Sequence, residues 1–167
     1  LVVDGQEILN FGRQSIPSFR PGHRINSGTF GTMGVGLPYA LGAQVALPDT
    51  QVICLHGDGS LGINFMEMDT AVRHKIPVLT IVSLNGGWTS DPQKQKPGRD
   101  LGLTRYHEMA RALGCFSVYV EDPKQIRPAL EEAMKASRQG IPSLINVRTD
   151  PDAQATTAKF TTFYDAA

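Results

Sequence analysis

The sequence has 167 residues, of which 41% are hydrophobic and 19% charged, a make-up typical of one globular domain and not of a disordered chain. Sixteen Lys and Arg residues balance sixteen Asp and Glu residues, so no excess positive charge is present to hold a nucleic acid or an anionic membrane surface. The longest apolar runs, such as Val78 to Leu84, are far shorter than the roughly 20 residues that span a bilayer.

Two cysteines, Cys54 and Cys115, are too few for a disulfide scaffold, and both lie in apolar stretches. We therefore expect buried, reduced thiols in a cytoplasmic protein, or in a peroxisomal one if the cell is eukaryotic. The chain opens on Leu1-Val2-Val3-Asp4-Gly5, which reads as the end of a buried strand with no initiator Met before it. We expect a piece of a longer polypeptide.

Short apolar runs alternate with amphipathic stretches along the chain, which predicts an α/β fold: a parallel sheet with helices on both faces. Strands are expected over residues 1–3, 52–56, 78–84, 116–120 and 143–147, and helices over residues 7–14, 34–47, 64–74, 106–113 and 123–138. Gly42 is expected to let the second helix approach a neighbour closely. Residues 1–150 are predicted to form the domain, and residues 151–167, which lack a clean period, a C-terminal tail.

Two consecutive predicted strands end in loops that suit an anion and a metal. Gly57-Asp58-Gly59-Ser60 follows the first, and Asn85-Gly86-Gly87 follows the second. Ligands of open parallel sheets lie outside the carboxyl ends of the strands. Glycines let backbone N–H groups approach a diphosphate, and a helix expected from about Gly62 points its positive end there. Asp58, Asn85 and a carbonyl of the second loop offer the oxygen ligands that Mg²⁺ prefers.

Gly57-Asp58-Gly59, followed after twenty-five residues by Asn85, resembles the signature of thiamine diphosphate-dependent enzymes, in the domain that holds the cofactor's diphosphate. The family often has two consecutive Asn residues where this chain has Leu84-Asn85. By spacing, Asn85 corresponds to the liganding one. The resemblance implies that Asp58, Asn85 and the Gly87 carbonyl hold Mg²⁺, and that residues 57–60 contact the diphosphate.

The stretch from Ser27 to Ala40 is similar to the family's loop and helix under the aminopyrimidine ring of the cofactor. The resemblance implies that the Gly31 carbonyl accepts a hydrogen bond from the 4′-amino group. It also implies that Met33 supports the bent cofactor conformation, a task that suits an unbranched, polarisable side chain. Alternatively, the Met33 side chain only fills space in the hydrophobic core. The resemblance covers residues 1 to about 151.

Within the family, the chain looks most like the 2-hydroxyacyl-CoA lyases and oxalyl-CoA decarboxylases, with acetolactate synthases next. Three segments carry this likeness: Gly86-Gly87-Trp88, Tyr106 to Ala110 and Asp122-Pro123. The implied reaction is cleavage of a 2-hydroxyacyl-CoA to an aldehyde or ketone and formyl-CoA. Trp88 then lies near the reacting carbon, or only anchors its loop. A decarboxylase or synthase acting on oxalyl-CoA or a 2-oxo acid is the enzymatic alternative, and a non-catalytic phosphate-binding subunit of flavodoxin type is the other.

The family's activating Glu belongs to a separate pyrimidine-binding domain, and no segment of this chain matches it. We therefore expect other polypeptide segments to supply the pyrimidine-binding and middle domains. The complete enzyme is expected to be a homodimer or homotetramer with its active sites at the interface, and this chain alone is expected to show no turnover. Gln6 and Glu7 follow the first strand, where relatives place groups that contact the diphosphate. Glu7 is a candidate proton shuttle, or a group that caps the helix.

Other polar and aromatic residues have two interpretations. His56 is expected to be a buried, hydrogen-bonded histidine and not an acid-base group. Lys94, Lys96 and Arg99 form a basic loop that either contacts a CoA phosphate or stays solvated. The C-terminal tail is expected to close over the site as a lid that excludes water, because it carries the aromatic residues Phe160, Phe163 and Tyr164.

Overall fold

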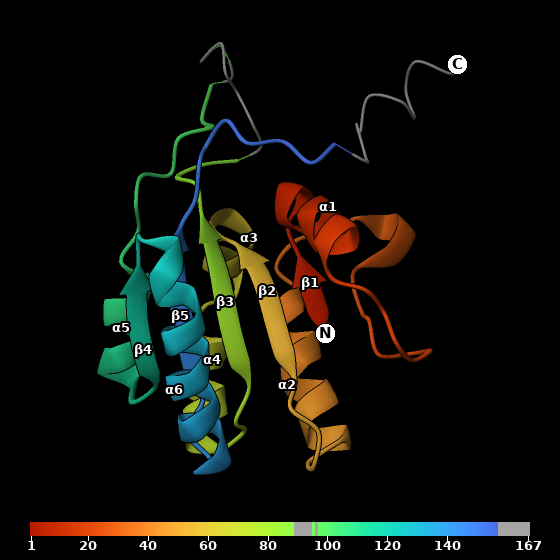
Figure 1. The fold of residues 1–167 in the computed structure, drawn as a ribbon, viewed down its shortest axis with the longest axis vertical. Helices are drawn as coiled ribbons and strands as arrows, with labels where there is room; N and C mark the ends of the chain where they lie inside the picture. Colours follow the sequence, from red (N-terminus) through yellow and green to blue (C-terminus); the bar gives the residue numbers. More distant parts are fainter. Residues whose placement is uncertain (89–94, 96, 157–167) are drawn as a thin grey trace.

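The computed structural model describes residues 1–88, 95 and 97–156. Five parallel strands form a sheet in the order β1-β2-β3-β5-β4 (Figure 1). The strands are β1 (Val2–Asp4), β2 (Ile53–Gly57), β3 (Leu79–Leu84), β4 (Phe116–Val120) and β5 (Ser143–Arg148). All five agree with the predicted strands to within one residue at each end. Because every strand runs the same way, the loops after β1, β2 and β3 meet at one edge.

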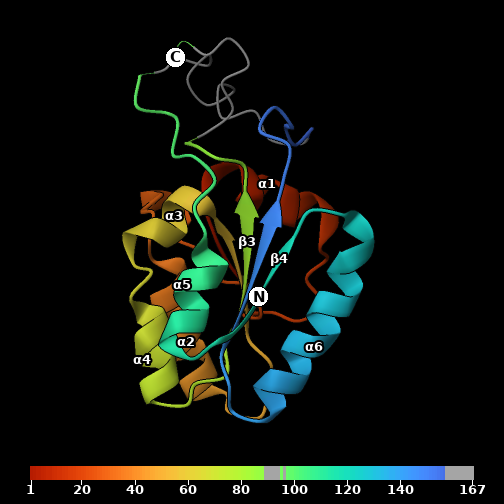
Figure 2. The same cartoon turned by 90° about the vertical axis from the view of Figure 1, so that its left-hand side faces the viewer.

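Helices cover both faces of the sheet (Figure 2). One face carries α2 (Gly36–Ala46), α3 (Asp58–Ile63), α4 (Glu67–Arg73) and α5 (Tyr106–Leu113), and the other carries α1 (Gln6–Ser15) and α6 (Ile126–Arg138). Two 3-10 turns, Gly28–Phe30 and Pro123–Gln125, precede α2 and α6. The predicted α/β fold is therefore confirmed.

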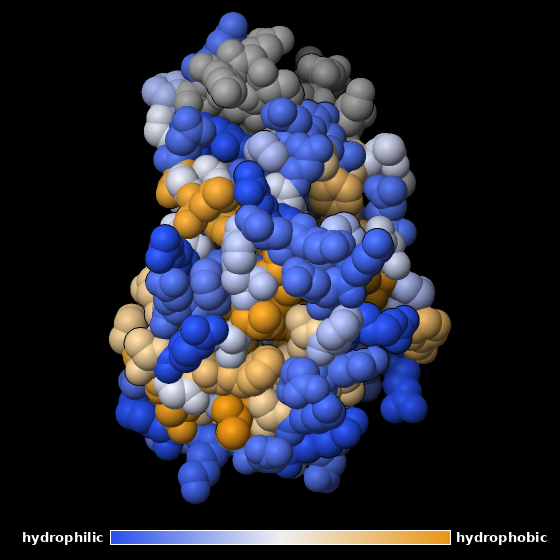
Figure 3. Space-filling model, turned by 60° about the vertical axis from the view of Figure 1, so that its left-hand side comes forward, coloured by the Kyte–Doolittle hydropathy of each residue, from blue (hydrophilic) through white to orange (hydrophobic). Residues whose placement is uncertain are grey.

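The core lies on both sides of the central strands. Val82 and Leu144 are buried in the cluster beneath α2 to α5, whereas Leu79 and Ile145 are buried in the cluster beneath α6. Neighbouring residues of a strand point to opposite faces, so β3 and β5 contribute to both clusters. On the outside, Figure 3 shows a largely hydrophilic face on which apolar side chains form several patches.

Both cysteines are buried and free of disulfide bonds, as expected. Burial raises the pKa of the Cys54 and Cys115 thiols, so both are held in the protonated, unreactive form. No helix among the described residues is long and apolar enough to cross a membrane.

Two expectations about helices are wrong. The helix expected over residues 64–74 begins only at Glu67, as α4, and a separate helix, α3, occupies Asp58–Ile63, where a loop was expected to lead into a helix from about Gly62. Between them the Asn64 side-chain amide donates to the Gly34 carbonyl oxygen at 2.8 Å. Gly42 does not serve a close approach, because a Cβ added there would meet no atom within 4 Å.

The beginning of the tail lies along α1. Ala155 is buried, its N–H donates to Glu7 Oε2 at 3.5 Å, and the Thr156 N–H donates to Gln14 Oε1 at 3.1 Å. Phe160, Phe163 and Tyr164, on which the expected lid depends, lie outside the described residues.

Candidate functional site

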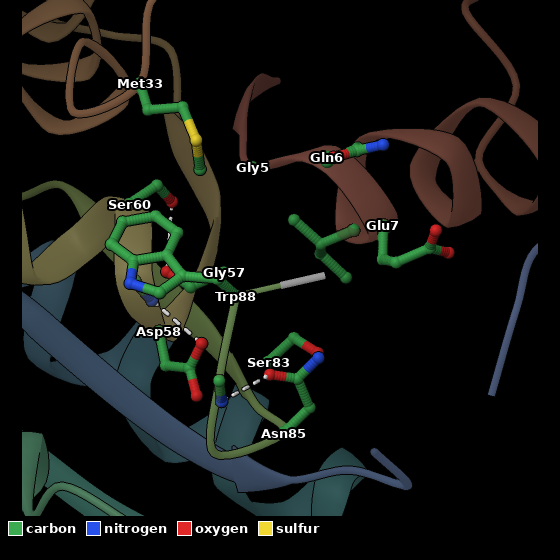
Figure 4. A pocket seen from close by; sticks show the side chains of 13 residues that line it. Gly5, Gln6, Glu7, Met33, Gly57, Asp58, Ser60, Ser83, Asn85 and Trp88 are labelled. Carbon is green, nitrogen blue, oxygen red and sulfur yellow. Dashed lines mark hydrogen bonds between the residues drawn. The ribbon is translucent and has the colours of Figure 1, made fainter. Parts of the chain in front are cut away.

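A pocket opens where β1, β2 and β3 end, and Figure 4 shows it from close by. Every site residue that we predicted lines it except Gly31, which is exposed. Three lining residues were not predicted from the sequence: Gly5, Ile8 and Ser83. The full lining is Gly5, Gln6, Glu7, Ile8, Met33, Gly57, Asp58, Gly59, Ser60, Ser83, Asn85, Gly87 and Trp88.

Asp58 joins the two loops of the pocket. It begins α3, and its Oδ1 accepts from the Gly59 N–H at 2.8 Å while Oδ2 accepts from the Gly86 N–H at 2.7 Å. Burial raises the pKa of the Asp58 carboxyl, and the N–H groups of the two loops together with the Arg99 guanidinium act in the opposite direction. A cation bound next to this buried carboxylate would favour its charged form, which burial disfavours.

Asn85 faces the same pocket from the end of β3. Its Oδ1 accepts from the Gly87 N–H at 3.2 Å, which holds the amide oxygen beside the turn (Figure 4). Among the described residues no group of three or more His, Cys, Asp or Glu gathers that could hold a metal. A metal here would therefore rely on one carboxylate, one amide and a backbone carbonyl. This set consists of oxygens alone, which fits Mg²⁺ and not a softer ion.

The Ser60 hydroxyl is occupied within the protein. It lies 2.9 Å from the Asp4 carbonyl oxygen and 3.0 Å from the Gly57 carbonyl oxygen, to which it donates, and 3.0 Å from His56 Nδ1. The hydroxyl is therefore engaged by three atoms of the protein itself. The contact of Ser60 with a diphosphate stays a prediction.

His56 is completely buried, as expected, and burial lowers the pKa of its imidazole to about 3. The ring is thus neutral at physiological pH. The expectation that it is fully hydrogen-bonded is wrong, because its Nε2 has no partner among the described residues. That nitrogen faces Gly36, where a Cβ would lie 2.8 Å from it.

Hydrogen bonds hold the segment that follows Met33 against β1 and against the residues after α3. The buried Asp4 carboxylate accepts from the Gly36 N–H through Oδ2 at 2.8 Å, and Asn64 holds the Gly34 carbonyl oxygen. Burial raises the pKa of Asp4, and the N–H groups of Gly36 and its neighbours oppose that shift. In Figure 4 Met33 points toward the pocket from the side opposite Asp58 and Asn85.

Gln6 and Glu7 occupy the first turn of α1 and not a loop. Both line the pocket, and Glu7 is the acidic residue of the first turn of α1, where its charge favours the positive end of the helix as the capping interpretation expects. Sequence reasoning also missed Tyr106, whose hydroxyl donates to the Asp58 carbonyl oxygen at 2.9 Å. No local signal marks that role, since Tyr106 is 48 residues from Asp58 along the chain.

Comparison with known families explains the constellation. Residues 9–147 match the model of the C-terminal TPP binding domain of thiamine pyrophosphate enzymes. The chain belongs to this family. It is a thiamine diphosphate-binding domain, and the pocket at the ends of β2 and β3 contains the two loops that the sequence signature singled out.

Similar proteins catalyse different reactions. The acetolactate synthase large subunit of Mycobacterium tuberculosis is 39% identical over 158 residues, and human 2-hydroxyacyl-CoA lyase 2 is 37% identical over 161 residues. Both alignments cover 90% of this chain but only 28% and 26% of those proteins. A solved 4-hydroxybenzoylformate decarboxylase from Rhodococcus jostii has 32% identity and a TM-score of 0.68, covering 76% of this chain and 25% of that one. The chain thus spans about a quarter of the length of these relatives.

Proposed function

We propose that this chain forms the diphosphate- and Mg²⁺-binding half of a lyase that cleaves a 2-hydroxyacyl-CoA into an aldehyde or ketone and formyl-CoA. The observation that carries the proposal is the position of Trp88, which lines the pocket beside Asp58 and Asn85 and packs on Gly59. An indole there gives the pocket an apolar wall against the acyl chain of a substrate. Relatives named 2-hydroxyacyl-CoA lyase, among them the human and Arabidopsis thaliana proteins, support it.

In this proposal the residues of the pocket, together with Gly31 outside it, each bind a different part of the cofactor. Asp58, Asn85 and the Gly87 carbonyl hold Mg²⁺, and the backbone of residues 57–60 contacts the diphosphate together with Gln6. Gly31 and Met33 support the aminopyrimidine ring. When bound, thiamine diphosphate supplies the electron sink that makes cleavage of a carbon–carbon bond possible. Met33 and Trp88 exclude water from the two sides of the pocket.

The proposal also requires a carboxylate that activates the cofactor, and no segment of this sequence resembles the family's domain that carries it. The activating Glu is assigned to a pyrimidine-binding domain, with a middle domain completing the enzyme as a homodimer or homotetramer. The share of the relatives that this chain covers, about a quarter, supports the assignment of these parts to other segments. Glu7, held near the Ala155 N–H, is retained as the proposed proton shuttle of this half.

An acetolactate synthase-like enzyme is the second candidate, because relatives with that name reach 39% identity. An oxalyl-CoA decarboxylase is the third, since it uses the same cofactor on a CoA ester. The products separate the three reactions. A lyase releases a carbonyl compound and formyl-CoA without CO₂, an oxalyl-CoA decarboxylase releases formyl-CoA with CO₂, and a synthase joins two 2-oxo acids and releases CO₂.

The test incubates the native protein, with any chain that copurifies, with thiamine diphosphate, Mg²⁺ and each of three substrates. These are a 2-hydroxyacyl-CoA, oxalyl-CoA and pyruvate, and mass spectrometry quantifies formyl-CoA, the carbonyl product and acetolactate. We expect formyl-CoA and an aldehyde from the first substrate only. Acetolactate from pyruvate, or CO₂ from oxalyl-CoA at a higher kcat/KM, would overturn the lyase assignment. The Asp58→Ala variant is the negative control.

A further inference from the structure

Arg99 lies next to the turn that carries Asn85 and Gly87. The chain lies against this turn again at Asp100, which forms an antiparallel bridge with Gly87. The Trp88 N–H donates to the Arg99 carbonyl oxygen at 2.8 Å, and the Leu101 N–H donates to the Gly86 carbonyl oxygen at 2.9 Å. Two backbone hydrogen bonds thus fix the position of Arg99 beside the turn.

The Arg99 side chain is directed onto the turn and largely buried, with 11% of its surface exposed. Nη1 donates to the Gly86 carbonyl oxygen at 3.5 Å. A Cβ at Gly87 would overlap Nη1 and lie 2.6 Å from Cζ, so the guanidinium covers one side of this glycine. The Asp100 carboxylate is 3.3 Å from Nη1, but it is 90% exposed and solvent screens its charge.

Asp58 and Arg99 contact the two ends of the same residue. The Gly86 N–H donates to Asp58 Oδ2, and the Gly86 carbonyl oxygen accepts from Arg99. A fixed positive charge therefore lies beside the oxygens proposed to hold the metal.

This charge has opposite effects on two possible ligands. A bare divalent cation is repelled by a buried guanidinium, and the Asp58 carboxylate offsets this repulsion only in part. A diphosphate brings more negative charge than one divalent cation neutralises, particularly beside Asp58. The Arg99 guanidinium therefore attracts the complex of metal and diphosphate, whereas it weakens binding of the bare metal at the same site.

We propose that Arg99 is a charge-balancing residue that makes metal binding at Asp58 and Asn85 depend on a diphosphate. This inference rests on the proposed binding of Mg²⁺ and thiamine diphosphate. Arg99 acts on the bound charges from behind the turn, so it is a positioning and binding residue and not a catalytic one. A contact with a CoA phosphate, which the sequence left open, is not needed for this role.

The test measures the affinity of Mn²⁺, which substitutes for Mg²⁺ and is followed by electron paramagnetic resonance. Titrations use the native protein, with any chain that copurifies, and compare Mn²⁺ alone with Mn²⁺ plus thiamine diphosphate. In Arg99→Gln, Mn²⁺ alone is expected to bind about tenfold more tightly, the effect of a unit charge on a divalent ion several ångströms away in a water-like medium. The Mn²⁺ complex of thiamine diphosphate is expected to bind several-fold more weakly.

Two variants serve as controls. Arg99→Lys keeps the charge and is expected to keep the ratio of the two affinities near that of the unaltered protein. Arg105→Gln removes an exposed arginine that pairs with Glu108 at 3.3 Å, and is expected to change neither affinity. Circular dichroism confirms that each variant folds.

The outcomes separate this inference from the proposed function. If the unaltered protein binds Mn²⁺ and thiamine diphosphate but Arg99→Gln leaves the ratio unchanged, or shifts both affinities in the same direction, the role of Arg99 is overturned and the proposed cofactor site stands. If the unaltered protein retains no Mn²⁺ complex of thiamine diphosphate, the proposed function fails and the inference fails with it.

Discussion

The indole ring of Trp88 lies directly over Gly59, so closely that a Cβ at position 59 would be 2.7 Å from Cζ3 and 2.8 Å from Cε3. This contact packs the loop after β3 onto the first turn of α3. The same two loops are joined by the hydrogen bond from the Gly86 N–H to Asp58. The positions of Asp58 and Asn85 relative to each other therefore depend on an aromatic contact as well as on a polar one.

Gly59→Ala is expected to destabilise the protein by about 1–3 kcal/mol, the usual cost of forcing an extra methyl group into a packed site. Because Trp88 is the only tryptophan of the chain, displacement of its ring is visible as a shift in intrinsic fluorescence. Urea titration followed by circular dichroism gives the free energy of unfolding. An unchanged emission maximum together with unchanged stability would contradict the packing described.

Gly42→Ala is the matched control for that variant. Position 42 also lies in a helix, but a Cβ there would meet no atom within 4 Å. Replacing a helical glycine by alanine in open space is expected to stabilise the protein by about 0.5–1 kcal/mol, with no change in tryptophan emission. A loss of stability would mean that the outer face of α2 is covered in the native protein.

Asp58→Ala is expected to weaken the Mg²⁺-dependent binding of thiamine diphosphate about a hundredfold, because the only carboxylate of the proposed ligand set is lost. Isothermal titration of the cofactor with and without Mg²⁺ measures the effect. Binding without dependence on Mg²⁺ in the unaltered protein would instead favour a phosphate-binding subunit. Acid is expected to mimic the variant: burial raises the pKa of Asp58, so protons compete with the metal at a higher pH than for an exposed carboxyl.

The sequence allowed the pocket to be located because Asp58 and Asn85 follow consecutive strands of a parallel sheet, whose ends must meet at one edge. The early start of α3 was missed since Gly59 and Gly62 have low helix propensity, and the contacts of Trp88 and the N–H groups around Asp58 override it. The error at Gly42 has another cause, because periodicity does not reveal whether a helix face is covered. Contacts across many residues, such as those of Arg99, follow only from the folded chain.

Tyr106→Phe removes a buried donor from the Asp58 carbonyl oxygen and is expected to cost about 1 kcal/mol of stability. The hydroxyl also limits the space at Gly62, where a Cβ would lie 2.7 Å from it. Gly62→Ala alone is therefore expected to destabilise by about 1–3 kcal/mol, and by less in the Tyr106→Phe background. Strictly additive free energies of unfolding in this double-mutant cycle would contradict the contact.

His56 is expected to make the protein sensitive to acid. Burial lowers the pKa of its imidazole from 6.5 to about 3, so between these values the unfolded chain binds a proton that the folded chain does not. The unfolded state then holds more protons, and stability falls as the pH falls, with a slope of up to about 1.4 kcal/mol per pH unit. Above 6.5 the ring is neutral in both states and its contribution is fully present.

The His56→Gln variant isolates this contribution. Asp4, 3.9 Å from Nδ1 of the ring, and Asp58 have raised pKa values and give slopes of the opposite sign, since the folded state holds their protons more tightly. Both carboxyls remain in the variant, so their slopes largely cancel when the two proteins are compared. Free energies of unfolding from urea titrations between pH 4 and 8, a range set around the unfolded value of about 6.5, are expected to converge as the pH falls. Parallel curves across that range would mean that His56 is protonated in the folded protein as readily as in the unfolded chain.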